Sequence, residues 1–187
     1  NLTLIYEKNK FQRAITRGNG EYGDDVSHLM TYCKGVPEYI QGHYNNIILT
    51  GECVTDNKVE NFRNYVSGAL GLKDANEFES RNIRFIVHDS LGTELDYTIR
   101  MELVEKMGFH TIFDKNLCGQ YPQDGIVYRI DNWKRCNQLG YTSKYPRFAI
   151  ALKERGTLTA KTILQDVIWV IGRTGMVTPV GLVDPVV

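Results

Sequence analysis

Residues 16–23 read TRGNGEYG, and residues 172–180 read GRTGMVTPV. Both stretches combine Gly, Thr and Arg within an apolar neighbourhood that is typical of β-strands. Glycine frees backbone amides for close approach, and these amides, with hydroxyls and a guanidinium, form a cationic lining suited to phosphate. Either stretch alone is also compatible with a surface turn, so the fold has to be inferred from the sequence between them.

The intervening sequence is rich in short runs of β-branched and aromatic residues bounded by turn residues, which predict strands. These runs are residues 2–7, 46–54, 82–92, 124–131, 147–153 and 166–172. Residues 61–72 and 98–107 have the apolar spacing of amphipathic helices. Because the strands outnumber the helices and do not alternate with them, we expect an α+β fold with antiparallel sheets.

Composition and charge exclude several classes of protein. The 187 residues contain 22 Lys and Arg against 22 Asp and Glu, whereas a module that held DNA unaided would be markedly basic. No apolar run is long enough to cross a bilayer and no signal-like segment opens the sequence, so we expect a cytoplasmic protein without a membrane partner. Cys33, Cys53, Cys118 and Cys136 form no C-x-x-C motif, which favours free thiols over a zinc ribbon.

Six blocks, in the same order, resemble the NAD-dependent DNA ligases. They are LTLIYEKNKFQRAITRGNGEYGDDVS (2–27), LTGECV (49–54), NFRNYVSGALGLKD (61–74), DGIVYRI (124–130), LGYTSKYPRFAIALKE (139–154) and VIGRTGMVTPVGLVDPV (170–186). The resemblance implies a nucleotidyltransferase core over residues 1–155, with two antiparallel sheets around a nucleotide cleft. It also implies that residues 156–187 begin an oligonucleotide-binding (OB) barrel.

The resemblance implies that three residues carry catalysis: Glu52, Asp124 and Lys153. Glu52 and Asp124 would ligate a metal, and Lys153 would stabilise the charge that builds on the α-phosphate. Each has a plainer alternative. Glu52 lies in an apolar strand, where a buried carboxylate needs a cationic partner unless it faces outward. The D-G dipeptide at Asp124 is also a common turn signal, and Lys153 is also compatible with a solvated strand end.

The resemblance further implies a set of residues that bind AMP or NAD⁺: Arg17, Glu52, Arg63, His88, Arg129 and Lys153. His88 takes the place of a tyrosine that stacks on adenine, although a lone histidine is more often structural. Arg129 takes the place of a lysine, and its guanidinium keeps the charge but spreads it over a plane. In TRGNG, Gly18 and Gly20 are expected to let the backbone approach the ligand closely.

The implied reaction has three steps and uses NAD⁺ and Mg²⁺. A lysine takes AMP from NAD⁺, the AMP moves to the 5′-phosphate of a nick in duplex DNA, and the 3′-hydroxyl displaces AMP. Mg²⁺ offsets the phosphate charge. Arg63, Arg173 and Thr174 would contact the nicked DNA. The implied partners are the other ligase segments, namely an upstream lysine-bearing helical part and downstream OB and helix-hairpin-helix domains.

One departure from the family leaves the activity of this chain open. The family's nucleophilic lysine belongs to a Lys-x-Asp-Gly block upstream of the opening strand, and no such block occurs in the 187 residues. As it stands, the chain is expected not to self-adenylate. It could be an excised piece, one half of a split enzyme or a sequence without its upstream residues. An inactive binding or scaffolding subunit and an ATP-dependent polynucleotide ligase are further alternatives.

Overall fold

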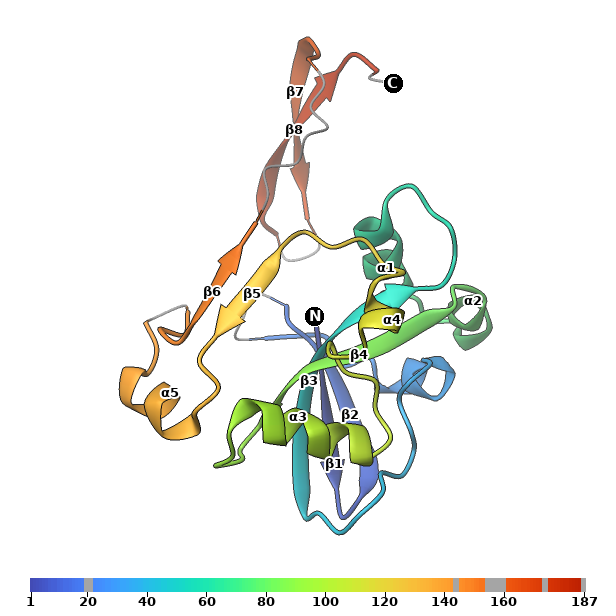
Figure 1. Cartoon of the computed structure of the whole chain (residues 1–187). Coiled ribbons are helices and arrows are strands. Elements are labelled where there is room, and N and C mark those ends of the chain that lie inside the picture. Colours follow the sequence, from blue (N-terminus) through green and yellow to red (C-terminus); the bar gives the residue numbers. More distant parts are fainter. Residues whose placement is uncertain (19–21, 143–144, 154–160, 173–174, 186–187) are drawn as a thin grey trace. The chain divides into compact units, whose positions relative to one another are not determined.

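The protein is described by a computed structural model that covers residues 1–187 except 19–21, 143–144, 154–160, 173–174 and 186–187 (Figure 1). The chain forms two compact units, Asn1–Leu152 and Lys153–Val187. The domain boundary expected after residue 155 falls within 154–160, outside the described residues. Within the described part of the chain, no helix is long and apolar enough to cross a membrane.

The first unit combines strands with short helices. In chain order these are β1 (Leu2–Glu7), β2 (Lys10–Thr16), the 3-10 helix η1 (Ser27–Tyr32), β3 (Asn46–Thr55), α1 (Phe62–Leu70), α2 (Ala75–Ser80), β4 (Ile83–Leu91), α3 (Tyr97–Lys106), α4 (Lys115–Cys118), β5 (Ile126–Arg129), α5 (Trp133–Leu139) and β6 (Ala149–Leu152). The second unit contains β7 (Leu164–Ile171) and β8 (Val177–Val183).

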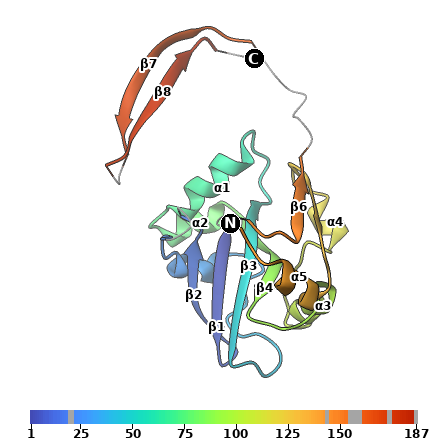
Figure 2. The same cartoon turned by 90° about the vertical axis from the view of Figure 1, so that its left-hand side faces the viewer.

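Every strand pairing is antiparallel among the named strands. The main sheet has the order β2-β1-β3-β4, and its strands lie side by side in Figure 2. β5 pairs with β6 to form a two-stranded ribbon, and β7 pairs with β8. The predicted α+β class with antiparallel sheets is therefore confirmed, whereas the nucleotidyltransferase cleft and the OB barrel stay predictions.

The hydrophobic core lies against one face of the main sheet. Leu2, Leu4 and Tyr6 alternate along β1 and are fully buried, as period-2 alternation requires of a strand with one covered face. Helix α3 covers part of that face, with Met101 and Val104 in the same buried cluster. The other face of the sheet carries mostly polar and half-buried side chains, together with the buried Ile86 of β4.

The predicted elements differ from the observed ones mainly where segments are short. The six predicted strands and two predicted helices are all present, although β5 is shorter than its predicted span of 124–131. The strands β2 and β8 and the helices η1, α2, α4 and α5 were not predicted. Helices of four to seven residues show little of the 3.6-residue periodicity by which longer helices are recognised.

Candidate functional site

A β-bulge lies at the centre of the candidate site. Gly51 of β3 pairs with Val87 and Thr50 pairs with Asp89, so His88 is the additional residue in β4. A bulge of this kind bends the strand and redirects a side chain. Gly51 is required here, because a Cβ at this position would collide with the carbonyl oxygen of Ile86 and would lie 2.6 Å from the Phe85 ring.

Three neighbouring strands bring Glu52 and His88 together at Asn1, the residue that precedes β1. The Asn1 side-chain amide lies 3.3 Å from Glu52 Oε1 and 2.9 Å from His88 Nε2. The Glu52 side chain is 60% exposed, so the structure agrees with the outward-facing alternative and not with a buried carboxylate. Glu52 faces outward because side chains alternate along β3, where Leu49 and Gly51 are buried and Glu52 lies on the opposite face.

The surroundings of His88 favour the neutral form of its ring. Burial lowers the pKa of His88, and this effect outweighs the opposite influence of the Glu52 and Asp89 carboxylates. The amide of Asn1 donates to Nε2 when the ring proton is on Nδ1, a tautomer assigned from the hydrogen bonding. A neutral, half-buried ring offers a face for stacking without the cost of desolvating a charge.

The loop that carries Arg17 begins beside the same residues. The Arg17 backbone amide donates to the Asn1 carbonyl at 3.3 Å, and the Arg17 side chain is exposed. Gly18 has φ +53°, and a Cβ there would collide with the Tyr22 carbonyl. This glycine is therefore needed for the loop's own path, and Gly20 lies outside the described residues. The expectation that both glycines admit a ligand stays a prediction.

The other predicted residues are not joined to Glu52 and His88 by the contacts described above. Arg63 is exposed in the first turn of α1, whose N-cap Asn61 accepts from the Asn64 amide at 3.0 Å. Asp124 is exposed just before β5. Lys153 is exposed directly after β6 and begins the second unit. The predicted DNA contacts Arg173 and Thr174 lie outside the described residues.

The residues present can complete a magnesium site only together with a ligand. Among the described residues, no group of three or more His, Cys, Asp or Glu side chains could hold a metal ion. Mg²⁺ is often bound by one or two carboxylates, and substrate phosphates and water complete its octahedron. Glu52 and Asp124 therefore fit Mg²⁺ only as partial ligands of a metal carried by phosphates.

Arg129 makes contacts that the sequence did not predict. Its guanidinium donates from NH1 to Asp89 Oδ2 at 3.1 Å and lies 3.6 Å from the centre of the Tyr97 ring. Arg100 forms an ion pair with the other oxygen of Asp89, also at 3.1 Å. Tyr97 and Arg100 are three residues apart in α3 and therefore lie on one face of that helix, a spacing that was visible in the sequence.

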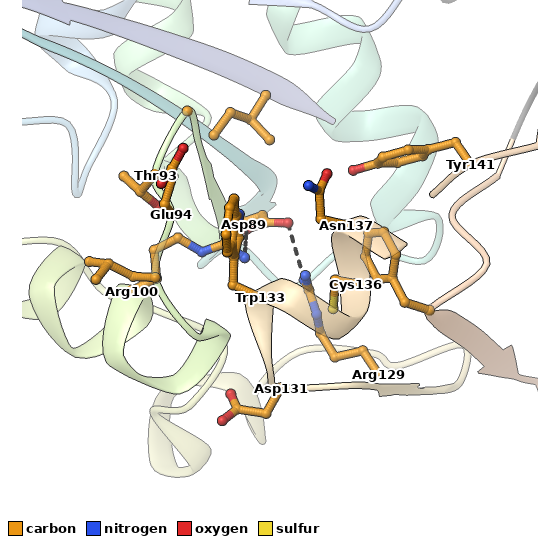
Figure 3. Close-up of a pocket in the computed structure, with 14 residues that line it drawn as sticks. Asp89, Thr93, Glu94, Arg100, Arg129, Asp131, Trp133, Cys136, Asn137 and Tyr141 are labelled. Atoms are coloured by element: carbon orange, nitrogen blue, oxygen red, sulfur yellow. Dashed lines mark hydrogen bonds and ion pairs between the residues drawn. The ribbon is translucent and has the colours of Figure 1, made fainter. Parts of the chain in front are cut away.

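A cavity of about 330 Å³ lies beside this ion cluster (Figure 3). Its lining includes the charged residues Asp89, Arg100, Arg129 and Asp131 and the aromatic residues Trp133 and Tyr141. Within the described chain, neither Glu52 nor His88 contributes to the lining. The cavity and the cluster of Asn1, Glu52 and His88 are therefore two separate features of the first unit, with adjacent residues of β4 in each.

Comparison with known proteins identifies the family. The sequence matches the NAD-dependent DNA ligase adenylation domain over residues 1–121 and 109–156. The chain belongs to this family. Curated DNA ligases resemble it over nearly its whole length. The DNA ligase of Wolbachia pipientis wMel is 32% identical over 214 residues, covering 98% of this chain. Those of Aquifex aeolicus and Campylobacter curvus are 30% and 32% identical, covering 99% and 100% of this chain.

The chain spans about a third of the length of these relatives. The aligned region makes up 32% of the Wolbachia ligase, 32% of the Aquifex ligase and 34% of the Campylobacter ligase.

Proposed function

We propose that this chain is the adenylate-binding part of an NAD-dependent DNA ligase that seals nicks in duplex DNA. The observation that carries the proposal is the meeting of Glu52 and His88 at Asn1 on the open face of the sheet. A carboxylate, a neutral ring and an arginine-bearing loop adjoin there without being covered by the core. These groups suit a nucleoside with hydroxyls to bind and a planar base to stack.

The proposed roles follow from the chemistry of each side chain. His88 stacks on adenine through its neutral ring, and Glu52 accepts hydrogen bonds from ribose hydroxyls or contributes to metal binding. The exposed guanidinium of Arg17 reaches the ribose or the phosphate. Burial of part of the ligand against this face would supply most of the affinity, while the polar groups would fix its orientation.

The phosphates would be bound by residues from several elements. Lys153 and Arg63 supply positive charge to the α-phosphate, and Glu52 with Asp124 places Mg²⁺ against it. Preorganised cations of this kind stabilise the charge that develops during transfer. Contacts to the nicked DNA would come from Arg63, Arg173 and Thr174. Because this chain has no net charge, the remaining ligase segments would supply most of the affinity for DNA.

The direction of the chain explains how a nucleophile would reach this site. The chain enters β1 through Asn1, beside Glu52 and His88. A lysine carried a few residues upstream of β1 would therefore be delivered to the α-phosphate of a bound nucleotide. Its amine would attack phosphorus, expel nicotinamide mononucleotide and form the lysyl-AMP from which AMP passes to the 5′-phosphate of DNA.

The proposal is tested by titrating AMP into the 187-residue chain in a calorimeter. We expect the chain to bind AMP, and Glu52→Ala to weaken the binding by about tenfold, the loss typical of removing one hydrogen-bonding partner of a charged group. Glu60→Ala is the matched control, because Glu60 is also an exposed glutamate and lies outside the site. Equal affinities of the two variants, or no binding by the unaltered chain, would contradict the proposal.

A second candidate is a binding subunit without catalytic activity. It is favoured by the ion pair of Arg129 with Asp89. Arg129 takes the place of a phosphate-binding lysine in the family resemblance, and its guanidinium is already paired with a carboxylate of the chain itself. A scaffold of this kind would not need the nucleotide. Its signature in the same titration would be AMP binding that is absent or insensitive to Glu52→Ala, together with retained binding to other ligase segments.

A further inference from the structure

Arg129 is enclosed by its neighbours in the first unit. Its side chain is 17% exposed, and its guanidinium lies 3.6 Å from the centre of the Tyr97 ring and 5.6 Å from that of Phe148. Its NH1 group donates to Asp89 at 3.1 Å. A planar guanidinium can stack on an aromatic ring and pair with a carboxylate at the same time, which a lysine ammonium cannot do.

Both oxygens of the Asp89 carboxylate are engaged by contacts within the first unit. Oδ2 accepts from Arg129, while Oδ1 accepts from the Ser90 amide at 2.8 Å and pairs with Arg100 at 3.1 Å. If Arg129 turned toward a phosphate, it would leave both this carboxylate and the face of Tyr97. Separating a largely buried ion pair is costly, and Asp89 would keep only Arg100 as an ion-pair partner.

These contacts join the β5–β6 ribbon to the main sheet next to His88. Arg129 ends β5, and Asp89 follows His88 in β4. The Tyr97 hydroxyl donates to the His88 carbonyl at 2.7 Å, so the ring that supports Arg129 also fixes the backbone of His88. A second connection lies two residues beyond Arg129, where the Asp131 carboxylate accepts from the Thr98 amide at 2.7 Å.

We propose that Arg129 is a positioning residue, which fastens the β5–β6 ribbon to β4 beside His88 through Asp89 and Tyr97, and is not a phosphate ligand. Figure 3 shows Arg129 directed at Asp89, with Arg100 approaching the same carboxylate from α3. The effect on nucleotide binding rests on the proposed function, since it assumes that His88 faces the base. The attachment of the β5–β6 ribbon to β4 does not rest on the proposed function.

The two roles of Arg129 are separated by comparing AMP with adenosine, which lacks the phosphate. A positioning residue supports the whole site. Arg129→Met should therefore lower the affinity for AMP and the affinity for adenosine by the same factor, about tenfold for a coupled contact pair. Asp89→Asn should reproduce this loss, because it releases Arg129 without removing its charge. Arg135→Met is the control, since Arg135 is an exposed arginine of α5 outside the ion cluster.

A phosphate ligand would give a different pattern. Arg129→Met would then lower the affinity for AMP but not the affinity for adenosine. Asp89→Asn would leave AMP binding unchanged or strengthen it, because the guanidinium would be released from its ion pair. Either result would overturn the proposal. Should Arg129→Met not fold, Arg129→Lys provides the same comparison, because a lysine could still contact phosphate but could not replace the stacked and paired guanidinium.

Failure of the proposed function would be recognised separately. If the unaltered chain binds neither ligand, the proposed function fails, and the fastening is tested by thermal unfolding of Asp89→Asn, Arg129→Met and the double variant. We expect the melting temperature of the double variant to fall by clearly less than the sum of the decreases in the two single variants, as for residues in direct contact. Additive losses would show that the pair is not coupled and would overturn the inference.

Discussion

The main sheet and the β5–β6 ribbon have similar sequences and opposite surroundings. Both are rich in β-branched, aliphatic or aromatic residues, yet Leu2 and Leu4 are fully buried in β1, whereas Ile126 of β5 is 58% exposed and Ile150 of β6 is 69% exposed. The sheet is stabilised by its core, whereas the ribbon and the segment that follows β5 are connected to the rest of the unit through polar contacts, of Arg129 with Asp89 in β4 and of Asp131 with Thr98 in α3. Apolar alternation therefore predicts a strand but does not predict what covers it.

The largest expected effect tests this difference in burial directly. Phe85→Ala removes a fully buried ring from β4 and should lower the free energy of unfolding by about 3–5 kcal/mol, the usual cost of a large-to-small change in a core. Ile150→Ala removes an exposed side chain from the ribbon and should change it by less than about 0.5 kcal/mol. Chemical denaturation of both variants measures the contrast, and similar losses would contradict it.

A smaller effect is expected where the main sheet is most tightly packed. Gly51→Ala would drive a methyl group against the Ile86 carbonyl and the Phe85 ring and should destabilise the fold by about 1–3 kcal/mol. Gly68→Ala is the matched control, because a Cβ at Gly68 in α1 meets nothing within 4 Å. Replacing a helical glycine by alanine should instead stabilise the protein by about 0.5–1 kcal/mol. A Gly51→Ala variant that is as stable as the unaltered protein, or more stable, would show that the bulge has room for a methyl group and would contradict this prediction.

The smallest effect concerns an ion cluster that also links the sheet to the segment before the ribbon. Asp56 accepts from Lys34 at 2.8 Å, from Arg84 at 3.1 Å and from the Tyr121 hydroxyl at 2.6 Å. Although burial alone would raise it, these hydrogen bonds hold the pKa of Asp56 well below its ordinary value of 3.8. Asp56→Asn should therefore cost about 1 kcal/mol at neutral pH.

The pH dependence of this effect has a definite sign. A carboxyl group whose pKa is lower in the folded than in the unfolded protein contributes stability above the unfolded pKa, and loses it as the pH falls toward the folded pKa. The difference between the unaltered protein and Asp56→Asn should thus shrink as the pH is lowered below 3.8. Denaturation curves at neutral and acidic pH check this, and a constant difference would show that the charge on Asp56 is not responsible.

Tyr121→Phe removes only the hydrogen bond from the Tyr121 hydroxyl to Asp56, and it should lower the stability in the same direction but by less than Asp56→Asn.

Several parts of the fold were predictable because they depend on local pattern. The helices α1 and α3 were both expected from residue spacing. In α3, however, the apolar spacing of Ile99, Leu103 and Met107 did not identify the buried face, because Ile99 is 48% exposed and the helix buries Met101 and Val104 instead.

The four-residue helix α4 was not expected, because its first turn depends on the Asp114 cap accepting from the Leu117 amide and not on a repeated face. Local pattern also could not reveal the bulge at His88, which exists only once β3 and β4 are paired.

The candidate site divides in the same way. Motif order in the sequence by itself determined the family and named Glu52, His88, Arg17 and Arg129 as residues of interest. Only the tertiary structure decided that Glu52 is exposed, that His88 and Glu52 meet at Asn1, and that Arg129 is paired with Asp89. The reason is physical: residue type sets which interactions a side chain can make, whereas strand register and the neighbours brought by the fold set which of them it does make.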